Sequence, residues 1–316
     1  MKTKFFFLIC ASLWLTSLPK SDAQEAGFDK PKFKTVKVDG LTIFYREAGD
    51  PTKPTILLLH GFPSTSHMYE SLMTDLSASY HLIAPDYPGF GNSSLPEPGH
   101  FIYSFDHLAT IIEDFVQTIG LNKFSIYMQD YGGPVGFRLA SAYPNKISAL
   151  IIQNANAYTT GLGAGFSNIM KMEQAGDRDG VEKILRQIIS FDGIKSQYTE
   201  GAASLENIAP EAYLTDYYYV QRPGSVDIQS ALFYDYHNNL TQYPQWQRYF
   251  RDHRPPTLIV WGKNDPIFTA PGASAYQEDL PHAEIYLLNG GHFALVEYHH
   301  EIAAHITTFL VKNGIK

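Results

Sequence analysis

The 316-residue chain has a formal net charge of −8, with 44% hydrophobic and 18% charged residues. These proportions are typical of a globular protein with a sizeable core, organised as one large domain or two small ones. The negative charge and the lack of a lysine- and arginine-rich run argue against a nucleic-acid partner.

The first 23 residues have the features of a secretory signal peptide. Two lysines precede the apolar run FFFLICASLWLTSL, and the small residues Ser21 and Ala23 stand just before a possible cleavage point ahead of Gln24. The run is shorter than the ~20 residues that span a bilayer as a helix. We therefore expect a secreted or periplasmic protein without stable membrane insertion. Cys10, the only cysteine, would leave with this segment, so the mature chain would lack disulfides and thiol chemistry.

From residue 33 onward, strand and helix signals alternate. Residues 34–48 predict two strands joined at Asp39-Gly40. Nearly unbroken apolar runs predict strands buried on both faces, at 55–61, 80–89, 124–130 and 147–155. Helices are predicted over 104–119 and 131–144, and strand–helix alternation returns over 256–265, 273–280, 283–292 and 297–312. Such repeated units indicate an α/β protein with a mostly parallel sheet flanked by helices.

Residues 156–250 interrupt this alternation. The segment is helix-prone, rich in Tyr, Asn and Gln, and inserted between two predicted strands. We interpret it as a helical lid over the carboxyl ends of the strands, where open α/β sheets place their sites. The expected organisation is a signal peptide (1–23), a core formed by 24–155 and 251–316, and a lid formed by 156–250.

Five motifs follow predicted strands in a recognisable order. HGFP follows the third strand, the segment DYPGFGNSS the fourth, and QDYGG the fifth, while WGKNDPIF and GGHF follow the last two. In this order the motifs resemble the α/β-hydrolase fold, across nearly the whole mature chain. The resemblance implies a mostly parallel central sheet flanked by helices, with an inserted helical lid.

The resemblance also implies a set of catalytic residues. In QDYGG, the strand-to-helix turn presents Asp130, where many family members have serine. The family order of nucleophile, acid and histidine then implies Asp265 and His292, with His292 as the base and Asp265 holding its other ring nitrogen. The backbone N–H groups of Phe62 and Tyr131 would form the oxyanion hole.

An aspartate nucleophile changes the expected target. A carboxylate is already anionic near neutral pH, and it attacks a saturated carbon that carries a leaving group. The product is an alkyl ester on Asp130, which water deprotonated by His292 can hydrolyse. We expect a small, apolar organic substrate and water as the partners, without a metal or organic cofactor. Carboxylesterase, lipase and peptidase activities are less favoured.

Epoxides and haloalkanes are the two substrate classes for this chemistry. Tyr131 stands where dehalogenases usually have a halide-binding tryptophan, and Phe62 matches the HGFP loop common in epoxide hydrolases, which favours epoxides. The segment FYDYHNN resembles the one from which epoxide hydrolases project a ring-opening tyrosine, which implies Tyr236 as the acid. The alternatives are haloalkane dehalogenation and a catalytically silent binding protein on the same fold. Further candidate substrate contacts are His60, Asn154, Tyr158 and Tyr218.

Overall fold

The computed structural model describes residues 30–316, so the expected signal peptide and Cys10 lie outside the described residues. The described residues form a central sheet of eight strands. Its strands are β1 (Lys32–Val38), β2 (Leu41–Ala48), β3 (Thr55–Leu59), β4 (His81–Pro85), β5 (Phe124–Gln129), β6 (Ile147–Gln153), β7 (Thr257–Gly262) and β8 (Glu284–Leu288). They are arranged in the order β1-β2-β4-β3-β5-β6-β7-β8. The pairs β1–β2 and β2–β4 are antiparallel, and the other five neighbouring pairs are parallel. This confirms the predicted mostly parallel sheet.

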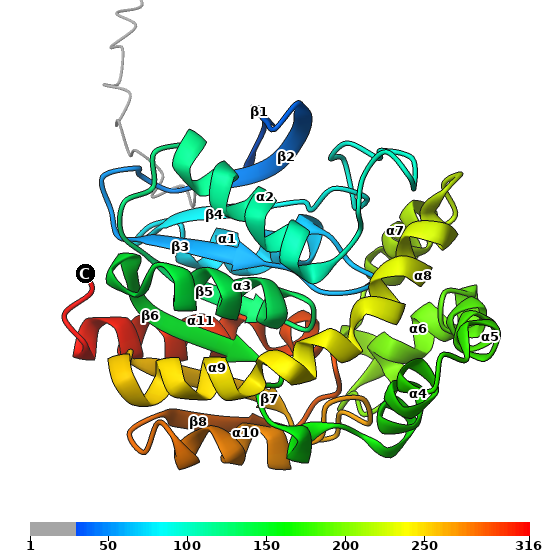
Figure 1. The fold of residues 1–316 in the computed structure, drawn as a ribbon. Helices are drawn as coiled ribbons and strands as arrows, with labels where there is room; N and C mark the ends of the chain where they lie inside the picture. The colour runs from blue at the N-terminus through cyan, green and yellow to red at the C-terminus, as the bar shows by residue number, and fades with distance from the viewer. Residues whose placement is uncertain (1–29) are drawn as a thin grey trace, which may run out of the picture.

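Helices cover both faces of this sheet, as predicted. In Figure 1, α2 and α3 lie in front of the sheet and α11 lies behind it, where α11 packs against α1. The core helices are α1 (Glu70–Leu76), α2 (Phe105–Thr118), α3 (Gly132–Ala142), α10 (Pro271–Ala275) and α11 (Ala294–Lys312). Short 3-10 turns are η1 (Ser66–Tyr69), η2 (Pro144–Lys146) and η5 (Tyr276–Glu278).

Two helical segments differ from the sequence-based prediction. The segment η1–α1 was not predicted, because seven residues of helix hold too few apolar positions for a periodic pattern; its Leu72, Met73 and Leu76 are nevertheless buried. The helix predicted over 273–280 ends at Ala275 and continues as η5. There the hydroxyl of Tyr276 donates to the carbonyl of Ala155 at 2.6 Å.

The segment between β6 and β7 consists of helices. They are η3 (Thr159–Gly161), α4 (Ala164–Gln174), α5 (Arg178–Ile188), α6 (Phe191–Thr199), η4 (Leu205–Asn207), α7 (Pro210–Val220), α8 (Ser225–Asp235) and α9 (His237–His253). In Figure 1, α4 to α8 gather at one end of the sheet, and α9 runs back along the core. We call α4 to α8 the lid helices.

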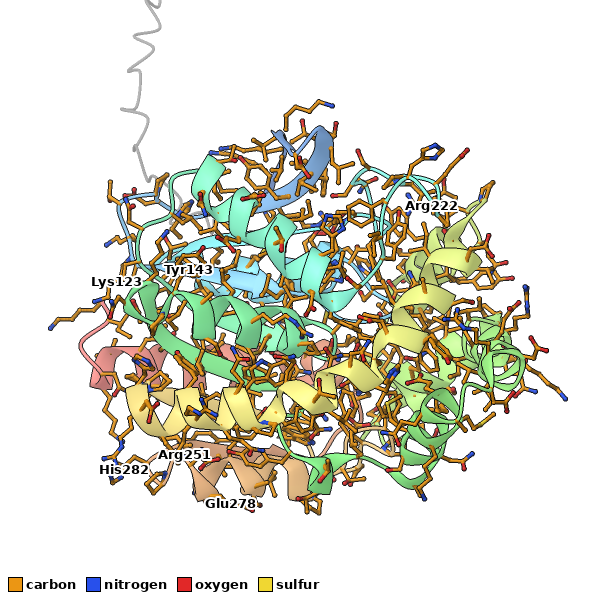
Figure 2. The ribbon with its side chains drawn as sticks, viewed as in Figure 1. Lys123, Tyr143, Arg222, Arg251, Glu278 and His282 are labelled. Carbon is orange, nitrogen blue, oxygen red and sulfur yellow. The ribbon has the colours of Figure 1, made fainter. Side chains whose placement is uncertain are left out.

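Polar and aromatic contacts join this inserted segment to the core. Figure 2 labels Arg222, which donates to the carbonyl of Gly91 at 2.6 Å, and Arg251, which pairs with Asp279 at 2.7 Å. The ring of Trp246 on α9 is buried, 5.2 Å from the ring of Phe137 on α3. Among the described residues, no helix has both the length and the apolar character needed to cross a membrane.

Candidate active site

Asp130 lies on a tight turn between β5 and α3. Its φ of 50° is in the left-handed region, which residues other than glycine adopt rarely and mostly where the surrounding structure enforces it. Glycines make this turn possible, because a Cβ on Gly132 would lie 2.0 Å from the carbonyl oxygen of Leu59. A Cβ on Gly61 would lie 2.3 Å from the Cβ of Asp130. These close approaches explain the glycines in the QDYGG and HGFP motifs.

Two backbone N–H groups hold the carboxylate of Asp130. The Phe62 N–H donates to Oδ1 at 2.7 Å, and the Tyr131 N–H also donates to the carboxylate. Burial raises the pKa of Asp130, while His292 and the two N–H groups oppose this rise by favouring the anion. The structure thus brings Phe62 and Tyr131 to the positions that an oxyanion hole requires.

His292 lies between two carboxylates. Its Nδ1 is 2.7 Å from Oδ2 of Asp265, and its Nε2 is 3.7 Å from Oδ2 of Asp130. Burial alone would lower the pKa of His292, but the charges of Asp265 and Asp130 outweigh burial and raise it. Gln129, on the last position of β5, approaches the same Nε2 through its side-chain nitrogen at 3.1 Å. Because an amide nitrogen only donates, this contact fits a neutral ring that has its proton on Nδ1.

Asp265 is fixed by contacts at both of its oxygens. Its Oδ1 accepts from the Ile267 N–H at 2.7 Å, and its Oδ2 accepts from Nδ2 of Asn154 at 2.8 Å. The Oδ1 of Asn154 in turn accepts from the Gly262 N–H at 2.9 Å. The expected contact between Asn154 and substrate is therefore wrong. Because β6 and β7 are neighbours in the sheet, the residue that follows β6 lies beside Asp265 and orients it.

Three other expected substrate contacts do not reach the site. His60 is buried below it, where its ring packs 4.2 Å from that of Tyr87 and its Nε2 accepts from the Tyr87 N–H at 3.4 Å. Burial lowers the pKa of His60, so the neutral ring is favoured. Tyr158 donates its hydroxyl to Asp279 at 2.7 Å, and Tyr218 on α7 is 68% exposed. His60 is thus a packing residue of the core. Tyr158 joins the start of the inserted segment to the core, and Tyr218 lies at the surface.

A cavity of about 470 Å³ lies between Asp130 and the lid helices. Such a volume is typical of small-molecule sites. Asp130, Tyr131 and His292 line it from the core, and α4 to α6 and α8 line it from the lid. Much of its wall is apolar, formed by Phe62, Phe166, Ile169, Ile188, Phe233, Pro266 and Ile267. No lysine, arginine or tryptophan is among the described residues that line the cavity.

Tyr236, the expected ring-opening acid, is buried just behind this wall. Its ring lies 4.8 Å from that of Phe166 and 5.9 Å from that of Tyr131, and both of those residues line the cavity. Tyr236 itself is not among the residues that line it, which disfavours the expected direct contact of Tyr236 with substrate. The hydroxyls of Tyr236 and Tyr131 are both buried without a hydrogen-bond partner. Tyr131 is the one tyrosine among the described residues that line the cavity, and its hydroxyl is buried behind the cavity surface.

One group of side chains with metal-ligand spacing occurs in residues 30–316, and it lies away from the cavity. Asp75 on α1 faces His299 and His300 on α11, with the three ligand atoms within 4.8 Å of one another. The Nδ1 atoms of His299 and His300 lie 2.6 and 3.0 Å from Oδ2 of Asp75. These contacts join α1 to α11 and include none of the residues around Asp130.

Comparisons with known proteins identify the family of this chain. Residues 54–297 match the α/β hydrolase fold family. An uncharacterised hydrolase of Saccharomyces cerevisiae is 40% identical over 89% of this chain and 98% of its own length. Haloalkane dehalogenase 2 of Mycobacterium tuberculosis is 29% identical over 84% of this chain and 90% of its own length. Epoxide hydrolase 4 of Homo sapiens is 26% identical over 73% of this chain and 64% of its own length.

A solved structure supports the same fold. The haloalkane dehalogenase of Bradyrhizobium elkani aligns with a TM-score of 0.75, over 90% of this chain and 99% of that chain, at 18% identity. At this identity the likeness concerns the fold alone. The family match covers well over half of the 316 residues. The chain therefore belongs to the family of α/β hydrolases.

Proposed function

We propose that this protein hydrolyses small, apolar epoxides through an ester formed on Asp130. One observation carries the proposal. A carboxylate, rather than a hydroxyl, occupies the strained turn, with Oδ1 held by the Phe62 N–H at 2.7 Å and Oδ2 facing His292. A carboxylate in this position attacks a saturated carbon and needs no base to activate it.

In the first step, Asp130 forms a bond to one epoxide carbon. The ring C–O bond breaks, and its electron pair goes to the ring oxygen, which takes the proton of the Tyr131 hydroxyl. Burial and the charge of Asp130 keep the pKa of Tyr131 well above its ordinary value. Because formation of the ester removes that charge, the proton becomes easier to donate as the reaction proceeds.

In the second step, water attacks the carbonyl carbon of the ester. His292 takes a proton from the water, and Asp265 stabilises the resulting imidazolium. The N–H groups of Phe62 and Tyr131 stabilise the negative charge on the carbonyl oxygen. The bond between the carbonyl carbon and the alkyl oxygen then breaks, and the alkyl oxygen takes the proton that remains on the oxygen delivered by water. This releases a diol and restores the carboxylate of Asp130. The proton on His292 returns to the phenolate of Tyr131, which restores the starting state.

Haloalkane dehalogenation is the second candidate, supported by the similarity to haloalkane dehalogenase 2. The same Asp130 would displace a halide, which needs hydrogen-bond donors but no proton. Two observations disfavour a halide clamp made of tryptophans. Neither Trp246 nor Trp261 lines the cavity, and the indole N–H of Trp261 already donates to the carbonyl of Phe268 at 2.9 Å.

The variant His292→Ala tests the proposal, because it removes the base of the second step and leaves the first intact. We expect epoxides to alkylate this variant, and intact-mass spectrometry would show an adduct of the full epoxide mass. A haloalkane would add its mass less hydrogen halide. Adducts from bromoalkanes alone would overturn the epoxide assignment. Failure of both classes, with an inert wild type, would favour a binding protein.

Two controls locate the reacting groups. His292→Ala combined with Asp130→Ala should form no adduct at all. In the His292→Ala background, Tyr131→Phe should slow epoxide alkylation by at least about 10²-fold, which is the usual contribution of a general acid. Tyr236→Phe should slow it less, because Tyr236 lies behind the wall. The reverse order of these two effects would make Tyr236 the acid.

A further inference from the structure

The lid contributes one buried polar side chain to the described cavity wall, that of Gln197 on α6. It is 8% exposed, whereas Gln187, Ser196 and Glu200, which also line the cavity, are exposed at its opening. The side-chain nitrogen of Gln197 is buried and has no hydrogen-bond partner. Buried amides are usually hydrogen-bonded, so this exception on a cavity wall requires an explanation.

The position of Gln197 is tightly determined by its neighbour. The ring of Tyr198 stacks on that of Phe293 with centroids 4.0 Å apart and planes 9° apart, and Phe293 directly follows His292. The hydroxyl of Tyr198 donates to Asp216, whose other oxygen lies 2.7 Å from Nε2 of His67 in the core. These contacts fix α6 against the core beside the candidate base. Gln197 is therefore presented to the cavity by a well-anchored helix.

The charges around the cavity restrict what can occupy it. Asp130 lies at its base and Glu200 at its opening, and the described wall contains no lysine or arginine. A substrate with a carboxylate or phosphate would meet the negative charges of Asp130 and Glu200 there, with His292 as the one side chain of the described wall that can become positive. An uncharged substrate with one hydrogen-bond acceptor suits this wall, because rotation of the Gln197 amide can turn its N–H group toward that acceptor.

We propose that the Gln197 amide donates a hydrogen bond to the atom that Asp130 displaces from carbon, and that the natural substrates are uncharged. This inference rests on the proposed function. For an epoxide, the acceptor is the ring oxygen. The hydrogen bond strengthens as negative charge develops on that oxygen, so Gln197 stabilises the transition state more than the bound substrate.

The rate of alkylation in the His292→Ala background isolates this step. We expect Gln197→Met to lower the saturating alkylation rate by epoxides about tenfold or more, the effect of removing one donor to a charged acceptor. The half-saturating epoxide concentration should change little, because an ether oxygen is a weaker acceptor than an alkoxide. The matched control is Gln174→Met, which alters an exposed glutamine at the end of α4 that does not line the cavity and should leave the rate unchanged.

Gln197→Glu keeps the shape of the side chain and serves as a second variant. Because a carboxylate accepts hydrogen bonds and repels the developing charge, it should slow alkylation at least as much as methionine does. Rates within twofold of the His292→Ala parent for both variants would overturn the inference. If only bromoalkanes alkylate the parent, the epoxide function fails, while the same comparison with a bromoalkane still decides the role of Gln197. If neither class alkylates it, both proposals fail.

Discussion

The candidate catalytic triad on the core side of the cavity is more completely paired than the buried polar side chains of the lid. On the core side, Asp130, His292 and Asp265 each have a partner at 2.7 Å. On the lid side, the side-chain nitrogen of Gln197 is buried without a hydrogen bond. Behind the cavity wall, the carboxyl of Glu173 on α4 is also buried without a hydrogen bond, with Nδ1 of His237 3.6 Å from its Oε2. The core is thus preorganised for the chemistry, as electrostatic catalysis requires. Of the lid groups, Gln197 lines the cavity and remains available to its occupant.

The largest expected effect comes from disturbing the core side with Asp265→Asn. An asparagine could donate to Nδ1 of His292 and so favour the wrong tautomer of the ring, as replacement of the triad acid does in other hydrolases. We expect ester hydrolysis to slow by about 10³–10⁴-fold, so that the alkyl adduct accumulates on Asp130. Intact-mass spectrometry during turnover measures this accumulation. Hydrolysis within tenfold of the wild-type rate would contradict the assigned role of Asp265.

The next effect concerns the stability of the lid and its dependence on pH. Burial raises the pKa of Glu173 from its ordinary value of 4.5 to about 9. Since the pKa is higher in the folded state, the stabilisation from the bound proton is fully present below pH 4.5 and is lost as the pH rises toward 9. Glu173→Gln has no such proton to lose. We expect it to be more stable than the wild type by about 1–3 kcal/mol near the upper end of this window.

Urea unfolding at both ends of that pH window measures the difference. Glu211→Gln, at an exposed position on α7, is the matched control and should show no pH-dependent gain. Equal gains for the two variants, or a gain for Glu173→Gln that does not grow with pH, would contradict the prediction. Ionisation of the buried Glu173 carboxyl would then not lower the stability of the lid.

The smallest expected effect concerns the opening of the cavity. Glu200 is exposed there, so its field is screened by solvent and salt. We expect Glu200→Gln to raise kcat/KM for a carboxylate-bearing epoxide by about two- to fivefold at low ionic strength, and to leave an uncharged epoxide unaffected. The gain should disappear at high ionic strength. An equal change for both epoxides would show that Glu200 acts through shape rather than charge.

The elements around the sheet were predictable from the sequence to very different degrees. The buried strands β3 to β6 stand out as apolar runs that end at turn residues, so their positions follow from local pattern. The helix α11 begins at Ala294, three residues before its predicted start. The short η1–α1 segment has no such local signal, and the structure alone revealed it.

The residues of the candidate site were likewise only partly predictable from the sequence. Asp130, Asp265 and His292 follow strand ends in recognisable motifs, and the structure brings them together because parallel strands end at one edge of the sheet. The contact of Asn154 with Asp265 joins residues 111 positions apart. No spacing in the sequence distinguishes this contact from a contact with substrate.

The sequence by itself determined the fold class, because this depends on local apolar runs and turn residues. Motifs that resemble those of the α/β-hydrolase family then implied which strand ends carry the candidate nucleophile, base and acid. The tertiary structure decided which lid side chains face the cavity. It placed Tyr236 behind the wall and Gln197 in it. The physical reason is that the direction of a helical side chain depends on how its helix packs. In the lid, that packing depends on distant contacts, such as the stacking of Tyr198 on Phe293.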